Sequence, residues 1–390
     1  MGVEPTRAAT RCVRGWARGA LLSEVGRAPY VGSWDAAAHD PADLVGAAVR
    51  QRLVELLCGQ ADPLGLPREL GAGLGEIRAA SRALVPLQLL ELARVRDLLD
   101  SEGVRYLVFK GPALAAQTTG DLGARGFGDL DVLVDPRSVE KVAAMLLTHG
   151  WSSAVPLPSP GSWAWQRILR SSHELTFAGS ACSVDLHWRL DTTYDALPAF
   201  EDLWGRRMLV DLGDGPVPTL GPGDALSHAC LNAAKDEWRW LRNLVDVHRL
   251  ARIEHVWDAF RPGRLQLHAL AVTDAQVGLP ESLPADVRGR LDRLRSRTAT
   301  RLVAAAERAQ ERPMRTLQEA PGSATTQFLR YQLAASASPR DVRRALGTLV
   351  LPGRVLGEVD ATSAWVGVPV GLGRRLGVLA RRSRDAGRLS

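Results

Sequence analysis

Cysteine and long apolar runs are both scarce in this chain, and each shortage excludes a class of protein. The 390 residues include only four cysteines, which lie far apart and form no Cys-x-x-Cys pair. A disulfide framework and a cysteine-ligated zinc site are therefore not expected, and a reducing cytoplasm is the predicted compartment. No apolar run approaches the roughly 20 residues that a membrane-spanning helix needs. The N-terminus carries arginines without an apolar segment behind them, which predicts no signal peptide.

Lysine is almost absent. Of the 49 basic residues, all but Lys110, Lys141 and Lys235 are arginine. This bias is typical of GC-rich coding, so a retained lysine suggests a need for a compact ammonium, although chance is the simpler explanation for Lys141. The net charge of +6 permits an anionic substrate and does not by itself indicate a nucleic-acid-binding protein.

The hydrophobic pattern divides the chain into a helical, a mixed and a second helical part. Residues 1–34 show little hydrophobic periodicity, so irregular structure is predicted there. Apolar residues recur at helical spacing over about 41–58 and 76–99, with a glycine- and proline-rich break between them. Helical spacing returns after residue 222 and continues to about 345. From residue 351 the chain becomes basic, which is typical of a solvated helix face more often than of a binding arm.

The middle of the chain carries shorter elements that predict a small sheet with helices. Strands are expected at 105–109 and 130–134, each followed by a helix, at 112–117 and 136–149. The segment "HELTFAGSACSVDLHWRL" from residue 173 predicts two strands joined by a turn, an antiparallel hairpin.

Charged residues lie at the ends of the first two predicted strands. Lys110 and Gly111 follow the first strand, and Asp129 and Asp131 begin the second. Charges beside buried strands are costly unless something binds them. The two carboxylates are two residues apart, so both point to one face, where their oxygens suit Mg²⁺. A solvated strand end remains the alternative for an isolated Asp-x-Asp pair.

Asp185 adds a third carboxylate from the middle of the second hairpin strand, where an unpartnered acid is expensive. If that strand lies beside the Asp-x-Asp strand, three carboxylates converge, as a two-metal phosphoryl-transfer site requires. Lys110 and Gly111 would then offer an ammonium and a close backbone approach to a triphosphate, with Arg125 as a second cation.

Several other polar residues have two interpretations each. His187 shares the face of Asp185, and it either supports that acid, contacts a phosphate or is a structural histidine. His173 and Glu174 begin the hairpin, either near a nucleotide or as a strand-edge pair. Four polar residues share one face of a predicted helix, which is either an acceptor-binding surface or a solvated surface: His228, Asn232, Lys235 and Asp236.

Three motifs in a fixed order carry a resemblance to a known family: KGPAL from residue 110, FGDLDVLV from 127 and VDLHW from 184. With them, residues 89–250 resemble the family called uncharacterised nucleotidyltransferases, within the polymerase-β-like superfamily. The resemblance implies an α+β fold, in which a polymerase-β-like core with a short mixed sheet is flanked by N-terminal helices and a C-terminal helical domain. The expected parts are 1–84, N-terminal helices; 85–210, nucleotidyltransferase core; 211–345, helical domain; and 346–390, basic tail.

The resemblance also implies a reaction, in which a nucleoside monophosphate moves from a nucleoside triphosphate to an acceptor hydroxyl or similar group and pyrophosphate is released. The family pattern places two Mg²⁺ ions on Asp129, Asp131 and Asp185. Nucleotide contacts are expected from Lys110, Gly111, Arg125 and His187. One departure is that Lys110-Gly111-Pro112 replaces the usual Gly-Gly or Gly-Ser start of the nucleotide loop, a variant similar to that of transferase toxins that modify tRNA ends.

Three functions follow from these observations. A small-molecule or peptide acceptor, as in antibiotic modification or natural-product tailoring, fits the modest charge and the helical flanking domain. A tRNA end as acceptor fits the basic tail. A catalytically idle protein that binds a nucleotide or a partner is the third possibility, and the presence of all three acids argues against it.

Overall fold

The computed structural model describes residues 5–26, 39–193, 196–294, 297–312, 321–336, 338–350 and 368. The chain forms two compact units, neither of which is one continuous segment. The first unit comprises Met1–Leu90, Phe109–Gly128 and Arg206–Tyr331, and the second comprises Glu91–Val108, Asp129–Gly205 and Gln332–Ser390. Most of the basic segment that the sequence predicts from residue 351 lies outside the described residues.

The fold is mixed α+β with a small mixed sheet, as the sequence predicts in these broad terms. The sheet contains five strands: β1 (Tyr106–Phe109), β2 (Asp129–Val134), β3 (Ser152–Ser153), β4 (Glu174–Ala178) and β5 (Ser183–His187). Their order is β1-β2-β5-β4-β3. Strands β2 and β5 run parallel, whereas β4 is antiparallel to both β5 and β3. The predicted hairpin is confirmed, and the Asp185 strand lies beside the Asp-x-Asp strand, which is the condition for their acids to meet.

Strand β2 lies between two other strands, and its composition reflects that position. All of its residues are buried except Asp129, which begins the strand. A strand covered on both faces is expected to be almost continuously apolar, so the buried carboxylate of Asp131 is the exception in β2. Such an exception indicates a site rather than a packing position.

The helices of the second unit connect and flank these strands. The 3₁₀ turn η2 (Pro136–Ser138) and α6 (Val139–Thr148) follow β2 at the place where the sequence predicts a helix. Asp135 begins this turn, because its side chain accepts a hydrogen bond from the backbone of Arg137 at 2.8 Å. Three further helices are α7 (Trp163–Ser171), α8 (Phe200–Gly205) and α17 (Pro339–Val350).

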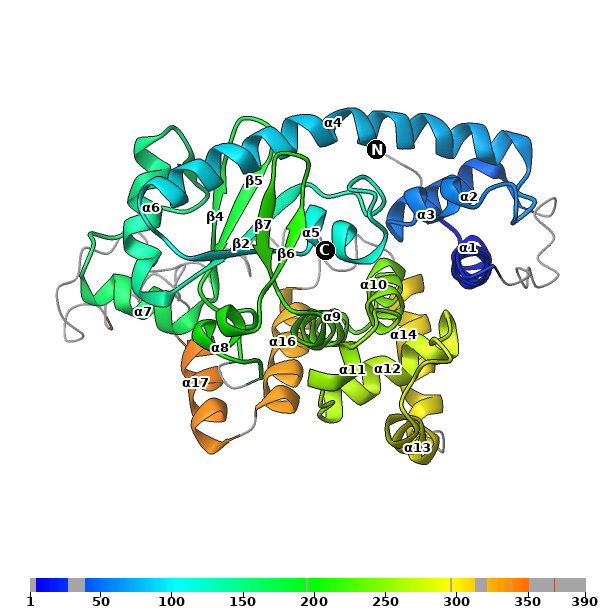
Figure 1. Ribbon diagram of the computed structural model, residues 1–390. Coiled ribbons are helices and arrows are strands. Elements are labelled where there is room, and N and C mark those ends of the chain that lie inside the picture. The colour runs from blue at the N-terminus through cyan, green and yellow to red at the C-terminus, as the bar shows by residue number, and fades with distance from the viewer. Residues whose placement is uncertain are drawn as a thin grey trace, which may run out of the picture. The chain divides into compact units, whose positions relative to one another are not determined.

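The first unit is largely helical. Its helices are α1 (Arg7–Ser23), α2 (Pro41–Arg50), α3 (Val54–Gly59), α5 (Gly111–Thr118), α9 (Pro222–Lys235), α10 (Leu241–Ala251), α11 (Val256–Ala259), α12 (Arg264–Gln276), α13 (Ala285–Leu294), α14 (Arg297–Glu311) and most of α16 (Pro321–Ala335). The first unit also contains a two-stranded hairpin of β6 (Met208–Asp211) and β7 (Pro216–Thr219). Helices α9, α10 and α12 pack against one another (Figure 1).

One helix corrects the sequence-based expectation. Residues 1–34 were expected to be irregular, but 7–23 form α1, which Thr6 caps by accepting a hydrogen bond from the backbone of Ala9. Ala9, Val13 and Trp16 line its buried face. Its buried apolar residues, which include Cys12 and Leu21, recur at helical spacing, so the sequence does carry an amphipathic pattern that the expectation of irregular chain overlooked.

Helix α4 (Arg68–Ser101) is longer than the 76–99 helix that the sequence predicts, and it continues through Pro86 (Figure 1). Its residues up to Leu90 belong to the first unit and the remainder to the second. Within the part of the chain that the structure describes, no helix combines the length and apolarity needed to cross a membrane.

Candidate functional site

The register between β2 and β5 brings two carboxylates together. Asp131 lies directly opposite Asp185, so both side chains point to the same face of the sheet. Asp131 is only 4% exposed, and Asp185 is half-buried. Ligand atoms of these two acids and of His187 all lie within 4.8 Å of one another, an arrangement that could hold a metal ion.

The pKa of the Asp185 carboxyl group is shifted by its surroundings. Burial raises the pKa of Asp185, and the neighbouring carboxylates of Glu174 and Asp131 act in the same direction. The hydroxyl of Thr176 opposes this by donating a hydrogen bond of 2.6 Å to Asp185 Oδ1. A divalent cation would supply the counter-charge that these crowded acids require.

His187 connects the acids to a second group of side chains. Its ring is 1% exposed, and its Nε2 lies 3.1 Å from Asp131 Oδ1 and 3.3 Å from Glu174 Oε2. His173 Nε2 lies 3.2 Å from the same oxygen of Glu174. His173, Glu174 and His187 therefore form a second set of potential metal ligands that shares His187 with the first.

Asp129 is placed differently from the other two predicted acids. It is the exposed first residue of β2 and lies opposite Ser183 in the register. It belongs to neither of the two sets of potential ligands found among the described residues. Its side chain nevertheless points to the same face as Asp131, because the two are separated by one residue in a strand.

The predicted nucleotide-binding residues Lys110 and Gly111 lie in the first unit, directly after β1. Lys110 has a φ of +57° and Gly111 one of +36°, and α5 begins at Gly111. A positive φ is unfavourable for a residue with a side chain and is often found at functional sites. The Lys110 ammonium lies 5.2 Å from the centroid of the Phe109 ring.

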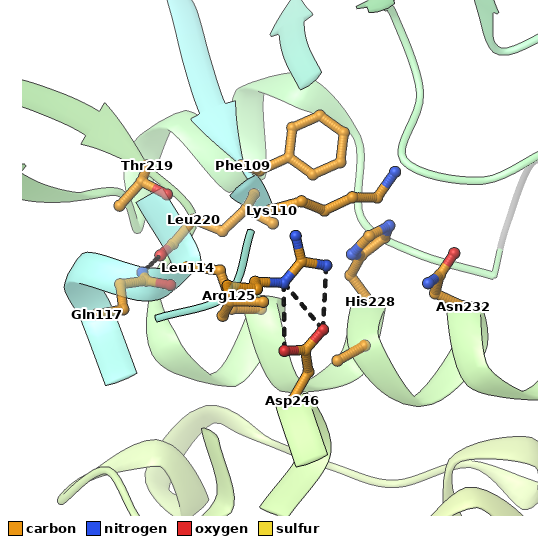
Figure 2. A pocket seen from close by; sticks show the side chains of 12 residues that line it. Phe109, Lys110, Leu114, Gln117, Arg125, Thr219, Leu220, His228, Asn232 and Asp246 are labelled. Carbon is orange, nitrogen blue, oxygen red and sulfur yellow. Dashed lines mark hydrogen bonds and ion pairs between the residues drawn. The ribbon is translucent and has the colours of Figure 1, made fainter. Parts of the chain in front are cut away.

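Lys110 and Arg125 line a small cavity of about 20 Å³ within the first unit (Figure 2). The guanidinium of Arg125 contacts the carboxylate of Asp246 at 3.0–3.2 Å. Both side chains are buried, with 7% and 8% exposed respectively. The predicted triphosphate contact is thus part of a buried ion pair, whose acid on α10 the sequence did not reveal.

The helix face predicted after residue 222 also reaches this cavity. His228 and Asn232 of α9 line it, and the His228 ring meets the Phe109 ring edge-on at 5.2 Å (Figure 2). Burial raises the pKa of Asp236 at the end of α9, opposed by Lys235 and by a hydrogen bond that Asn243 donates at 3.3 Å. This face is therefore partly enclosed and is not simply a solvated surface.

The sequence indicated some of these contacts and missed others. His173, Glu174 and His187 were recognised as polar residues of the hairpin, but their meeting at one point depends on the β4–β5 register. Thr176 and Asp246 carried no signal in the sequence, since a threonine in a strand and an aspartate in an amphipathic helix are both ordinary.

The comparison with known proteins agrees with this geometry. No curated protein matches the chain. The family model described as uncharacterised nucleotidyltransferase matches residues 37–272, which is more than half of the chain and includes all three predicted acids. The chain therefore belongs to the uncharacterised nucleotidyltransferase family, and it is a nucleotidyltransferase.

Proposed function

We propose that this protein moves a nucleoside monophosphate from a nucleoside triphosphate to a hydroxyl or similar group of a small molecule or peptide, with Mg²⁺ bound and with release of pyrophosphate. The observation that carries the proposal is the direct opposition of Asp131 and Asp185 within a metal-sized group of ligands. In a member of a nucleotidyltransferase family, paired carboxylates on one sheet face are what a metal-assisted phosphoryl transfer needs.

Asp129, Asp131 and Asp185 would hold two Mg²⁺ ions. The ions would neutralise charge that develops on the triphosphate. Asp185, held by the Thr176 hydroxyl, would take the proton of the acceptor hydroxyl. Burial excludes water from Asp131 and His187, which strengthens the electrostatic interactions of both side chains.

Positive charge for the triphosphate would come from the residues after β1. Lys110 offers a compact ammonium and Gly111 a backbone that can approach a phosphate closely. We propose a supporting role for Arg125, although Asp246 already compensates part of its charge. His187 would contribute through Asp131, which its Nε2 contacts.

We further propose that residues 85–210 form a core of the polymerase-β type, between an N-terminal helical region (1–84), a helical domain (211–345) and a basic tail (346–390). The short mixed sheet and its two acid-bearing parallel strands support this assignment. The compact units divide the chain differently, because Phe109–Gly128 groups with the first unit.

The choice of a small acceptor rests on the modest net charge of +6. Nucleic-acid binding generally requires a strongly basic face. A tRNA acceptor would show itself as nucleic acid that copurifies with the protein and raises the 260/280 nm absorbance ratio, and as tRNA binding that weakens steeply with salt. Either result would overturn the small-acceptor assignment.

The test of the reaction is mass spectrometry of the protein and of candidate acceptors after incubation with each nucleoside triphosphate and Mg²⁺. A mass gain of one nucleotide identifies both the reaction and its target, and EDTA should abolish the gain. Activity that survives EDTA would show that no divalent cation is involved.

Variants separate binding from transfer. Asp185→Asn should retain triphosphate binding in calorimetry and lose transfer, by about 100-fold or more if it removes the proton acceptor. Asp129→Asn should lose both, and Asp202→Asn, an exposed acid on α8, should lose neither. If Asp185→Asn transfers at the wild-type rate, Asp185 is not part of the catalytic site.

A further inference from the structure

We propose that His173, Glu174 and His187 form a second cation site, which binds a divalent transition-metal ion of the zinc and cobalt class. The site lies beside the Asp131–Asp185 pair and shares one residue with it. The proposal concerns binding at the base of one hairpin and does not depend on the nucleotidyl-transfer reaction.

The spacing of the three ligand atoms fits an ion. The Glu174 Oε2 atom lies 3.2 Å from His173 Nε2 and 3.3 Å from His187 Nε2. A tetrahedral zinc-type ion with bonds of about 2.0–2.1 Å has ligand atoms about 3.3–3.4 Å apart. All three atoms lie within 4.8 Å of one another, so a small closing movement of the two imidazoles completes the set.

The β4–β5 hairpin holds these side chains in place. Glu174 lies opposite His187 in the antiparallel register. His173 directly precedes β4, and its carbonyl accepts a hydrogen bond of 3.0 Å from the backbone of Trp188. The two imidazole rings meet edge-on, with centroids 5.6 Å apart. All three ligands therefore come from the open end of one hairpin, where its register brings them together.

Burial makes the site enclosed on one side and accessible on the other. The side chains of His187 and His173 are 1% and 11% exposed, whereas Glu174 is 36% exposed. An ion could therefore enter along the Glu174 carboxylate. Three protein ligands leave a coordination position for water, as in metal sites that bind a substrate rather than closed structural sites.

The ligand types select the ion. Two imidazole nitrogens and one carboxylate suit zinc, cobalt and similar ions, whereas Mg²⁺ prefers a shell of oxygens. The opposed pair Asp131 and Asp185 supplies oxygens and remains suited to Mg²⁺. The neutral imidazole of His187 has one lone pair, so His187 can ligate an ion in only one of the two sets at a time.

The experiment is a titration of the full chain with Co²⁺ in the presence of excess Mg²⁺. Calorimetry and the visible absorption of Co²⁺ both monitor the binding. We expect one Co²⁺ per chain, with the intense visible bands of a nitrogen-ligated, low-coordinate ion. Without Co²⁺ binding by the wild-type protein, the proposal fails. The readout requires no turnover, so its failure would leave the nucleotidyltransferase proposal standing.

Two substitutions locate the ion. His173→Gln should weaken Co²⁺ binding by more than the roughly 10- to 100-fold that loss of an outer-shell partner costs. Asp185→Asn should leave Co²⁺ binding intact, because Asp185 belongs to the other set. His149→Gln is the matched control, since His149 is an exposed histidine at the end of α6.

The opposite pattern would overturn the proposal. If Asp185→Asn abolishes Co²⁺ binding and His173→Gln does not, the ion lies among Asp131, Asp185 and His187. Should His173→Gln fail to fold by circular dichroism, Glu174→Gln replaces it, because it removes one ligand charge from a side chain that is 36% exposed. Wild-type Co²⁺ affinity in a folded Glu174→Gln variant would equally refute the site.

Discussion

The ion pair of Arg125 and Asp246 leads to a prediction about both stability and function. Asp246→Ala removes a carboxylate that contacts the guanidinium at 3.0–3.2 Å. Because the Arg125 side chain is only 7% exposed, water cannot replace that carboxylate without a rearrangement. We therefore expect Asp246→Ala to unfold far more easily than the wild type.

The size of the effect follows from burial. Breaking a buried ion pair by removing one partner costs about 3–5 kcal/mol, since the other charge stays buried. Each kcal/mol of lost stability lowers the melting temperature by about 2 °C in a protein of this size class. The melting temperature should therefore fall by roughly 6–10 °C. Thermal and urea unfolding followed by circular dichroism measure this loss.

A control in the same unit sets the scale. Glu307→Ala removes a carboxylate that is 43% exposed, and its partner Arg14 retains Glu311 at 3.7 Å. We expect Glu307→Ala to cost about 1 kcal/mol or less. If the two variants lose equal stability, the buried ion pair of Arg125 and Asp246 does not contribute as the structure indicates.

The double variant Arg125→Met with Asp246→Leu then separates structure from function. Replacing both charges by apolar side chains of similar volume is often neutral for stability or favourable. A stable double variant with unchanged triphosphate affinity would show that Arg125 is structural. A stable double variant with weakened affinity would support the proposed contact with the triphosphate.

Three further predictions concern other positions. Lys110→Ala should weaken triphosphate binding by about 2–3 kcal/mol in calorimetry, and Lys110→Arg should restore it only partly; unchanged affinity in both would exclude a phosphate contact. Gly179→Ala should lower the free energy of unfolding, measured with urea, by about 1–3 kcal/mol, because its Cβ would overlap the Glu91 carboxylate and lie 2.8 Å from the Cys182 carbonyl. Burial raises the pKa of Asp236, so the native state holds that proton more tightly than the unfolded chain, and stability falls as the pH rises through the native pKa. Asp236→Asn should therefore have a higher free energy of unfolding than the wild type at pH 7 and lose this gain by about pH 4. A gain that does not vary with pH would contradict the raised pKa of Asp236.

The sheet and its acids could be predicted because their signals are local. Short apolar runs bounded by glycine and charged residues predict buried strands, and a turn of small residues between two such runs predicts a hairpin. The acid in the second hairpin strand raised the condition that this strand lies beside the Asp-x-Asp strand. The parallel pairing of β2 and β5 meets that condition.

Helix α1 was missed, although its signal is also local. Its buried face depends on small residues such as Ala9 and Ala17, which are completely covered in the structure. With Val13, Trp16 and Leu21 they form an apolar stripe at helical spacing, so the amphipathic pattern is present in the sequence. Helix α1 contacts α2, α3 and α10, and this packing stabilises it.

The partners of charged side chains depend on register and on contacts between distant segments, and neither property is written in a local pattern. Shifting β5 by one residue against β2 would place Leu186 opposite Asp131 and turn Asp185 to the other face. The same is true of β4, whose register alone brings Glu174 to His187. A sequence therefore indicates which residue types are available for a metal site, whereas the pairing of three strands decides which of them meet. At His187 both pairings converge, so this one histidine contacts acids from two strands, Asp131 of β2 and Glu174 of β4.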